Sequence, residues 1–416
     1  MKMKYSFADF ESIRTAVECL RFKGDPLSYD DQLAMLTHVG PLQKTILKIP
    51  YRDRAQKILN TWKRLLSEKK GKGKCELADS TASYFFPELF QPIFKAQADA
   101  KFTFIDLFAG IGGFRLAMQS CGGRCVFSSE WDENAKKTYL NNFGEMPFGD
   151  ITLESTKACI PDGFDVLCAG FPCQAFSIAG YRKGFEDTRG TLFFDVAEII
   201  KRKRPKAVYL ENVKNLYTHD NGKTFEVIKN TLEELGYVVY HKVMNAMEYA
   251  NVPQNRERIF IVCFDPKQVP NHADFKFPSP VKLTKTIHDC IDENETAPEL
   301  FYTDKMNHFK DLQEGITSRD SVYQWRRQYV RENKSHVCPT LTANMGTGGH
   351  NVPLILTEAG IRKLSPKECI NFQGYPTKYE FPKNISNAAK YKQAGNSVVV
   401  PLITRVSQNI ISVMLK

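Results

Sequence analysis

One cysteine in this chain stands where catalytic groups are often found. In the run Asp165-Val-Leu-Cys-Ala-Gly-Phe-Pro-Cys-Gln174, the apolar residues predict a short buried strand, which Gly170 and Pro172 end. Cys173 follows in the loop, and α/β folds place their ligand and catalytic groups in loops that leave the strand ends. Taken alone, the cysteine fits two roles: a nucleophile or, more often, an inert buried thiol.

Six further short motifs surround this loop, in the order Phe104-Ile-Asp-Leu-Phe-Ala-Gly-Ile-Gly-Gly-Phe114, Ser129-Glu-Trp-Asp132, Gly149-Asp-Ile151, Glu211-Asn-Val213, Gln254-Asn-Arg-Glu-Arg258 and Gln393-Ala-Gly-Asn-Ser-Val398. The glycines of the first motif lie between an expected strand and helix, where a backbone turn can approach a ligand closely. Glu130 ends the next expected strand, near the roughly 20-residue spacing of a carboxylate that holds a ribose. Trp131 could stack on adenine. A dehydrogenase would fit this first part nearly as well.

All seven motifs, in this order, resemble the cytosine-5 DNA methyltransferases of bacterial restriction-modification systems, from about residue 101 onward. The resemblance implies an α/β fold with a Rossmann-like, S-adenosylmethionine-dependent methyltransferase domain, built on a doubly wound, largely parallel sheet. It also implies methyl transfer from S-adenosyl-L-methionine to carbon 5 of cytosine in a specific duplex DNA sequence. The expected cofactor-binding residues are Phe108, Ile111, Gly113, Glu130, Trp131, Asp150, Ile151, Pro172, Leu192, Asn396 and Val398.

Carbon 5 of cytosine is a poor nucleophile, so the ring must first be activated by covalent addition. In the family pattern, the thiolate of Cys173 adds to carbon 6. Glu211 could hydrogen-bond N3 and the exocyclic amine, and an apolar pocket would keep it partly protonated. Arg258 offers positive charge for O2 of the base. Arg256 is either a second such group or a member of an ordinary ion pair.

The target cytosine must leave the base stack to reach this pocket. The loop after Cys173 is a candidate cover for the extruded base, and sequence readout is expected within residues 276–386. There, aromatic and basic residues alternate in Tyr323-Gln-Trp-Arg-Arg-Gln-Tyr-Val-Arg331, and residues 339–350 are polar and glycine-rich. In the alternative interpretation, Trp325 and Tyr329 pack a small core and the arginines contact only phosphate. The expected DNA contacts are Gln174, Ser177, Arg326, Arg327, Thr340, Leu341, Gly348 and Gly349.

The elements that must position these residues follow from hydrophobic periodicity. Strands are expected at residues 102–107, 124–129, 165–169, 207–210, 238–243 and 258–263, and helices at 192–202 and 224–235. This alternation favours a parallel sheet, in a catalytic domain over 99–275 that a C-terminal helix within 387–416 completes. Residues 276–386 form a smaller, irregular target-recognition domain.

Residues 1–98 are expected to be a helical N-terminal extension, with one helix ended by Gly40 and another over 54–66. The extension either packs on the catalytic domain or binds DNA, unspecifically or through a helix-turn-helix.

Composition sets the remaining bounds. The net charge of +10 suits a polyanionic partner, here duplex DNA. Met1-Lys-Met-Lys4 lacks the apolar region of a secretory signal, and no apolar run approaches a membrane span, so we expect a cytoplasmic, nucleoid-associated protein without membrane contact. The eleven scattered cysteines predict reduced thiols and no metal site. A monomer is expected, and a cognate restriction endonuclease acting on the same site is a candidate partner.

Two other functions remain open at this stage. An RNA methyltransferase would share the same motifs, although the long segment before Arg362 favours DNA. A purely regulatory DNA-binding protein would have no use for Cys173, Glu211 and Arg258 together. Amino-methylating enzymes are disfavoured because the Asp- or Asn-Pro-Pro-aromatic loop is absent from the sequence.

Overall fold

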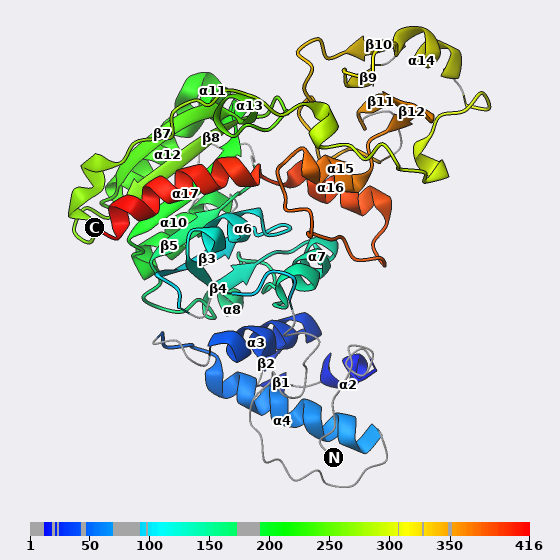
Figure 1. Ribbon diagram of the computed structural model, residues 1–416. Coiled ribbons are helices and arrows are strands. Elements are labelled where there is room, and N and C mark those ends of the chain that lie inside the picture. The colour runs from blue at the N-terminus through cyan, green and yellow to red at the C-terminus, as the bar shows by residue number, and fades with distance from the viewer. Residues whose placement is uncertain are drawn as a thin grey trace.

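The computed structural model describes residues 12–18, 21–22, 25–42, 47–69, 92–96, 99–172, 192–306, 308–326, 328–347 and 352–416. Figure 1 shows a central sheet, a group of N-terminal helices beside its β4 end, and a smaller sheet at the opposite side of the molecule.

The central sheet has six strands in the order β4-β3-β5-β6-β8-β7. Strands β3 to β6 run parallel, and β8 is antiparallel to both of its neighbours, β6 and β7. Strand β5 is buried along its whole length, as expected for a parallel strand that is covered on both faces. The strands are β3 (Phe102–Leu107), β4 (Gly123–Ser129), β5 (Val166–Ala169), β6 (Ala207–Val213), β7 (Val238–Asn245) and β8 (Glu257–Phe264). The predicted α/β fold with a largely parallel sheet is confirmed.

Helices cover both faces of this sheet, which makes it doubly wound. On one face, α6 (Gly113–Ser120) and α17 (Val400–Met414) share a core with alternate residues of the strands. On the other face, α10 (Leu192–Lys203) and α12 (Lys223–Glu234) do the same. The segment Asn387–Met414 is apolar and long enough to cross a membrane, but 67% of its apolar window is buried, so it is a core element here.

Short elements complete the connections. They are α7 (Glu133–Phe143), α8 (Glu154–Lys157), α11 (Asn215–Thr218), α13 (Ala246–Tyr249), and the 3₁₀ turns His219–Gly222, Pro270–Asp274, Ile287–Asp289 and Pro298–Leu300. Helix α7 is capped at its start by Asp132, whose side chain accepts from the backbone N–H groups of Asn134 and Ala135.

The region expected to be irregular contains a second sheet, of order β10-β9-β11-β12, in which all pairs are antiparallel. Its strands are β9 (Tyr323–Arg326), β10 (Tyr329–Glu332), β11 (Leu354–Thr357) and β12 (Gly360–Lys363), with α14 (Phe309–Gly315) alongside. Trp325 lies in its small core, whereas Tyr329 is 60% exposed. Each strand has only four residues, too few for a clear alternation of polar and apolar side chains.

The N-terminal helices are α2 (Arg14–Glu18), α3 (Tyr29–Leu42) and α4 (Arg52–Lys69), with the short strands β1 (Arg21–Phe22) and β2 (Asp25–Pro26) between α2 and α3. The prediction that Gly40 ends a helix was wrong, because α3 continues to Leu42. Buried residues of these helices belong to the same core as one face of the central sheet. The described N-terminal helices therefore pack on the sheet.

A buried carboxylate organises the segment between the small sheet and the C-terminal helices α15 (Pro366–Asn371) and α16 (Asn387–Asn396). Glu368, 1% exposed, accepts two hydrogen bonds from Arg362, at 2.7 and 2.8 Å, and others from the backbone N–H groups of Ser365 and Asp292. It also closes a capping box with Ser365 at the start of α15. Glu368 thereby connects β12, α15 and the loop at residue 292.

We predict that Glu368→Gln lowers the free energy of unfolding by about 3–5 kcal/mol, because it leaves the Arg362 guanidinium buried without a counter-charge. The matched control is Glu358→Gln, which removes an ion pair of Arg319 whose glutamate side chain is 84% exposed. That change should cost less than about 1 kcal/mol. Urea unfolding of both variants checks the prediction, and equal midpoints for the two would contradict it.

Candidate active site

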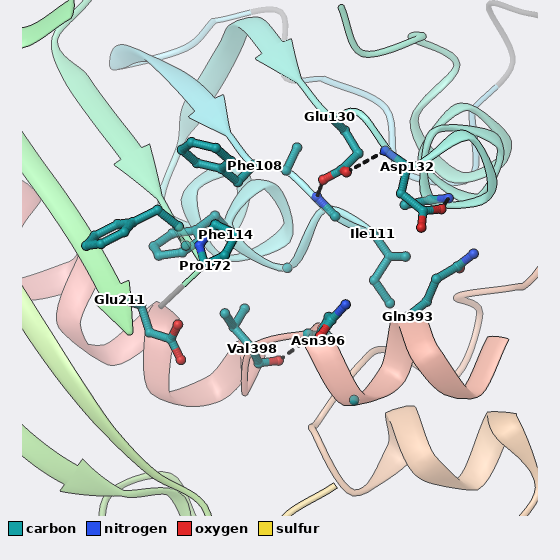
Figure 2. A pocket seen from close by; sticks show the side chains of 18 of the residues that line it. Phe108, Ile111, Phe114, Glu130, Asp132, Pro172, Glu211, Gln393, Asn396 and Val398 are labelled. Carbon is teal, nitrogen blue, oxygen red and sulfur yellow. Dashed lines mark hydrogen bonds between the residues drawn. The ribbon is translucent and has the colours of Figure 1, made fainter. Parts of the chain in front are cut away.

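A cavity of about 400 Å³ opens where four parallel strands end. Residues that directly follow β3, β4 and β5, together with the end of β6, form much of its wall, and the start of β8 and the end of α16 complete it. The lining comprises Phe108, Ala109, Gly110, Ile111, Gly113, Phe114, Glu130, Trp131, Asp132, Ala135, Gly170, Phe171, Pro172, Glu211, Asn212, Val213, Arg256, Arg258, Lys392, Gln393, Gly395, Asn396, Ser397 and Val398. Figure 2 shows that side chains from elements far apart in the sequence surround this one space.

The turn after β3 has an unusual backbone. Phe108 and Gly110 both have a φ of 53°, in the left-handed region. This conformation costs a non-glycine residue energy, and residues that adopt it are often found at functional sites. A Cβ placed on Gly110 would meet nothing closer than the carbonyl oxygen of Phe108, at 4.0 Å. A Cβ on Gly113 would instead lie 2.4 Å from a methyl carbon of Val398. Gly110 thus leaves space beside the turn, and Gly113 permits close packing against the residues after α16.

Glu130 holds this turn against the end of β4. Its carboxylate accepts hydrogen bonds from the backbone N–H groups of Gly110, Trp131 and Asp132, at 2.8, 2.9 and 2.8 Å (Figure 2). Burial raises the pKa of Glu130, and these hydrogen bonds oppose the shift. A carboxylate has about four acceptor sites, so this one retains capacity for a ligand hydroxyl. The neighbouring Trp131 is 75% exposed and is part of the cavity lining.

Glu211 and Arg258 come together because of the strand register. Glu211 pairs with Phe260 and Val213 with Arg258 across the antiparallel β6–β8 ladder, so the two charged residues are diagonal neighbours on one face. Arg258 Nε lies 3.1 Å from Glu211 Oε1. Burial raises the pKa of Glu211, and the nearby Arg258 and Arg256 oppose the shift. The arrangement therefore favours a carboxyl group that can hold a proton beside a fixed positive charge.

Arg256 is only 2% exposed, so it is not a member of an ordinary ion pair at the surface. Its guanidinium donates to the carbonyl oxygens of Leu341 at 2.8 Å, Gly395 at 3.1 Å and Ser397. Burial, and then the charge of Arg258, lower its pKa. Nε of Arg256 has no hydrogen-bond partner among the residues that the structure describes. Arg256 thus connects the start of β8 to the loop at residue 341 and to the end of α16.

Most expected cofactor residues meet in this cavity, as do the catalytic candidates Glu211, Arg256 and Arg258. Eight of the cofactor candidates line it: Phe108, Ile111, Gly113, Glu130, Trp131, Pro172, Asn396 and Val398. Asp150, Ile151 and Leu192 are not part of its lining. Ile151 is buried, and Asp150 accepts from the backbone N–H of Thr152 at 2.9 Å. The candidates Cys173, Gln174, Ser177, Arg327, Gly348 and Gly349 lie outside the described residues.

The remaining candidates for DNA contact are not part of the cavity lining. Arg326 is exposed at the end of β9. Thr340 donates its hydroxyl proton to the carbonyl oxygen of Asn255 at 2.6 Å. The side chain of Leu341 is buried in a hydrophobic cluster. Their contacts with DNA stay predictions.

Sequence reasoning missed several residues of the site. Asn212 donates to the carbonyl oxygen of Phe171 at 2.8 Å and so ties the end of β6 to the turn that leads to Cys173. Lys392 forms an ion pair of 2.7 Å with Asp132 across the cavity wall, and Gln393 accepts from Thr138 at 2.8 Å. Asn212 and Gln393 both lie within motifs recognised in the sequence, and this position could have indicated that they belong to the site.

Comparisons with known proteins agree with this geometry. The profile of the family described as C-5 cytosine-specific DNA methylase matches residues 102–412. The chain is 51% identical to the type II methyltransferase M.Bsp6I of Bacillus sp. over 313 residues, 74% of this chain and 98% of that protein. It is 45% identical to M.HhaI of Haemophilus parahaemolyticus over 322 residues, 74% of this chain and 93% of that protein.

Solved structures resemble the fold at much lower identity. The S. pombe Dnmt2 methyltransferase aligns with a TM-score of 0.57 at 16% identity, over 75% of this chain and 99% of that one. The Entamoeba histolytica methyltransferase EhMeth aligns with a TM-score of 0.54 at 17% identity, over 76% of this chain and 99% of that one. With the sequence matches, which span about three quarters of the chain, the assignment is plain: this protein belongs to the C-5 cytosine-specific DNA methylase family.

Proposed function

We propose that the protein transfers a methyl group from S-adenosyl-L-methionine to carbon 5 of a cytosine in a specific duplex DNA sequence, as part of a type II restriction-modification system. One observation carries the proposal: a single cavity joins the glycine turn and Glu130 to the Glu211–Arg258 pair. Pro172, the residue before Cys173, is in its wall. The names of M.Bsp6I and M.HhaI, both type II methyltransferases, support the biological setting.

The cavity wall fits S-adenosylmethionine. Gly110 leaves a space that a side chain would fill, Glu130 offers a carboxylate to a ribose, and Trp131 offers an exposed ring to an adenine. Its volume falls within the range of about 300–1,000 Å³ that is usual for cofactor sites. The bound cofactor supplies an electrophilic methyl group on a sulfonium. Asn396 and Val398 would contact it from the C-terminal side, and Asp150, Ile151 and Leu192 remain proposed contacts.

The residues around the base have distinct roles in this proposal. The thiolate of Cys173 adds to carbon 6, and the ring electrons move toward carbon 5 while N3 takes a proton from Glu211. Arg258 stabilises the negative charge that develops at O2 and also orients Glu211. Arg256, whose Nε has no partner among the described residues, adds positive charge behind them. Once carbon 5 has taken the methyl group, with cleavage of its bond to the sulfonium sulfur, water removes the carbon 5 proton, the thiolate leaves carbon 6 and N3 returns its proton to Glu211.

The same proposal covers the DNA. The cytosine rotates out of the helix at a cost of a few kcal/mol, and the loop with Gln174 and Ser177 closes over it. We propose a division into residues 1–98, a catalytic domain of 99–275 with 387–416, and a target-recognition domain of 276–386. DNA contacts in the last are assigned to Arg326, Arg327, Thr340, Leu341, Gly348 and Gly349. The enzyme acts as a monomer on cytoplasmic, nucleoid DNA beside a cognate endonuclease.

Cys173→Ser should reduce methyl transfer by about 10³-fold or more, because a serine hydroxyl is a far poorer nucleophile, while DNA binding persists. Wild-type protein should also form a stable adduct with duplexes that contain 5-fluorocytosine, and the variant should form none. Full activity of Cys173→Ser would refute the covalent step.

Two further assays test the substrate. Bisulfite sequencing of DNA from expressing cells identifies the modified sequence, and a parallel assay on tRNA tests the RNA alternative.

Glu211→Gln should lower kcat by about 10²–10⁴-fold, since the amide can hydrogen-bond N3 but cannot transfer a proton. Because burial raises the pKa of Glu211, the wild-type rate should fall as pH rises through that raised pKa, and the variant should lack this fall. Glu257→Gln is the matched control, since Glu257 is half-exposed and pairs with Lys214. A pH profile shared by wild type and Glu211→Gln would contradict the proposed role.

A further inference from the structure

The segment 145–148 lies at the junction of the elements that carry the cofactor candidates. Phe148 donates its N–H to the carbonyl oxygen of Ser128 at 2.8 Å and accepts the N–H of Glu130 at 2.9 Å. Glu130 is the residue that holds the glycine turn, and the chain continues from Phe148 directly into Gly149 and Asp150. A displacement of this segment would therefore move Glu130 and Asp150 together.

The same segment is joined to α6. The Glu145 carboxylate receives two hydrogen bonds from Arg115, at 2.7 and 2.8 Å, and both side chains are almost fully buried. Arg115 belongs to the first turn of α6, the helix that begins at Gly113 of the glycine turn. Segment 145–148 thus connects to the cofactor site through α6 as well as through β4.

Helix α3 of the N-terminal group holds this segment from its other side. The buried hydroxyl of Thr37 accepts the N–H of Met146 at 3.0 Å and gives its own proton to the carbonyl oxygen of Ala34 at 3.2 Å. The rings of His38 and Tyr51 each lie 5.2 Å from the ring of Phe148. Because these groups are buried, losing one partner would leave the other without a hydrogen bond or create a void.

His38 extends the contact to β4. Its Nδ1 lies 2.9 Å from the carbonyl oxygen of Ala34, so Nδ1 carries a proton. Burial lowers the pKa of His38, which keeps the ring neutral and leaves Nε2 to accept a hydrogen bond from Ser128 at 3.3 Å. Glu145 Oε2 is 3.8 Å from Nε2, and Arg115 already neutralises it. Ser128 is two residues before Glu130.

A second contact anchors the same helix to α7. Asp30 Oδ2 forms a 2.7 Å ion pair with Lys136, whose side chain is 4% exposed. The family match begins at residue 102. In each of these contacts with segment 145–148, β4 or α7, the N-terminal partner therefore lies outside the matched region and the other partner lies inside it.

We propose that Thr37 and His38 are positioning residues for the cofactor site, and that the N-terminal helices thereby set the affinity for S-adenosylmethionine. The inference rests on the proposed cofactor. Neither residue is part of the cavity lining; both act through Met146, Phe148 and Ser128 on Glu130 and Asp150.

The test is Thr37→Val in the full chain, with Thr37→Ser as the conservative variant and Thr61→Val as the matched control. Thr61 bonds to the carbonyl oxygen of Lys57 within α4. Thr37→Val leaves the N–H of Met146 buried without an acceptor. Calorimetric titration with S-adenosylmethionine should then show a Kd raised by up to about tenfold, the limit at which the bound state alone loses the free energy of this hydrogen bond. KM for the cofactor should rise equally, while kcat at saturation and the Kd for DNA stay within about twofold.

Thr37→Ser should restore the wild-type Kd, and Thr61→Val should leave it unchanged. Equal Kd values for wild type and folded Thr37→Val would overturn the positioning role alone. No saturable binding by the wild-type protein would instead overturn the proposed cofactor.

A second measurement needs no variant. Coupling between two sites is reciprocal, so saturation with S-adenosylmethionine should slow amide exchange in residues 34–39 of α3 as well as in the glycine turn. Protection of the glycine turn without any change in α3 would overturn the inference, even if Thr37→Val does not fold.

Discussion

One buried guanidinium fixes the shape of the active-site wall. A charge removed from water needs hydrogen-bond partners, and the terminal nitrogens of Arg256 find them in the carbonyl oxygens of Leu341, Gly395 and Ser397. Residues 395–398 line the cavity, so the position of its C-terminal wall follows from that of Arg256, at the start of β8. Gly395 allows the approach, because a Cβ there would lie 2.1 Å from the carbonyl oxygen of Thr342.

Much of the fold could be predicted from the sequence because its parallel strands are mostly buried and each contains a short apolar run. The six strands of the central sheet and helices α10 and α12 lie within a few residues of their predicted positions. The small sheet could not be predicted, since strands of four residues carry too little periodicity. The α3 boundary was missed because the helix continues through Gly40 to Leu42, although glycine commonly follows the end of a helix.

The candidate site, like the fold, could be predicted only in part from the sequence. Residues within the motifs, such as Glu130 and Glu211, could be placed at strand ends, but which groups touch depends on register and tertiary contacts. The diagonal pairing of Glu211 with Arg258 depends on the antiparallel alignment of β6 and β8, which the motifs do not encode. The burial of Arg256 and the contacts of Thr37 and His38 with segment 145–148 join positions far apart in the chain, and no local pattern indicates them.

Residues from both early and late parts of the matched region line the cavity. Six residues within 108–114 line it, whereas Asn396 and Val398 come near the end of the match to the family. Helix α17, which follows them, packs on α6. Proteins are synthesised from the N-terminus, and domains fold largely as they emerge from the ribosome. A nascent chain that has not yet reached residue 396 lacks the part of the cavity wall that Asn396, Ser397 and Val398 form. Competence for methyl transfer therefore arises late in translation, and a ribosome that stalls before this point yields an inert polypeptide.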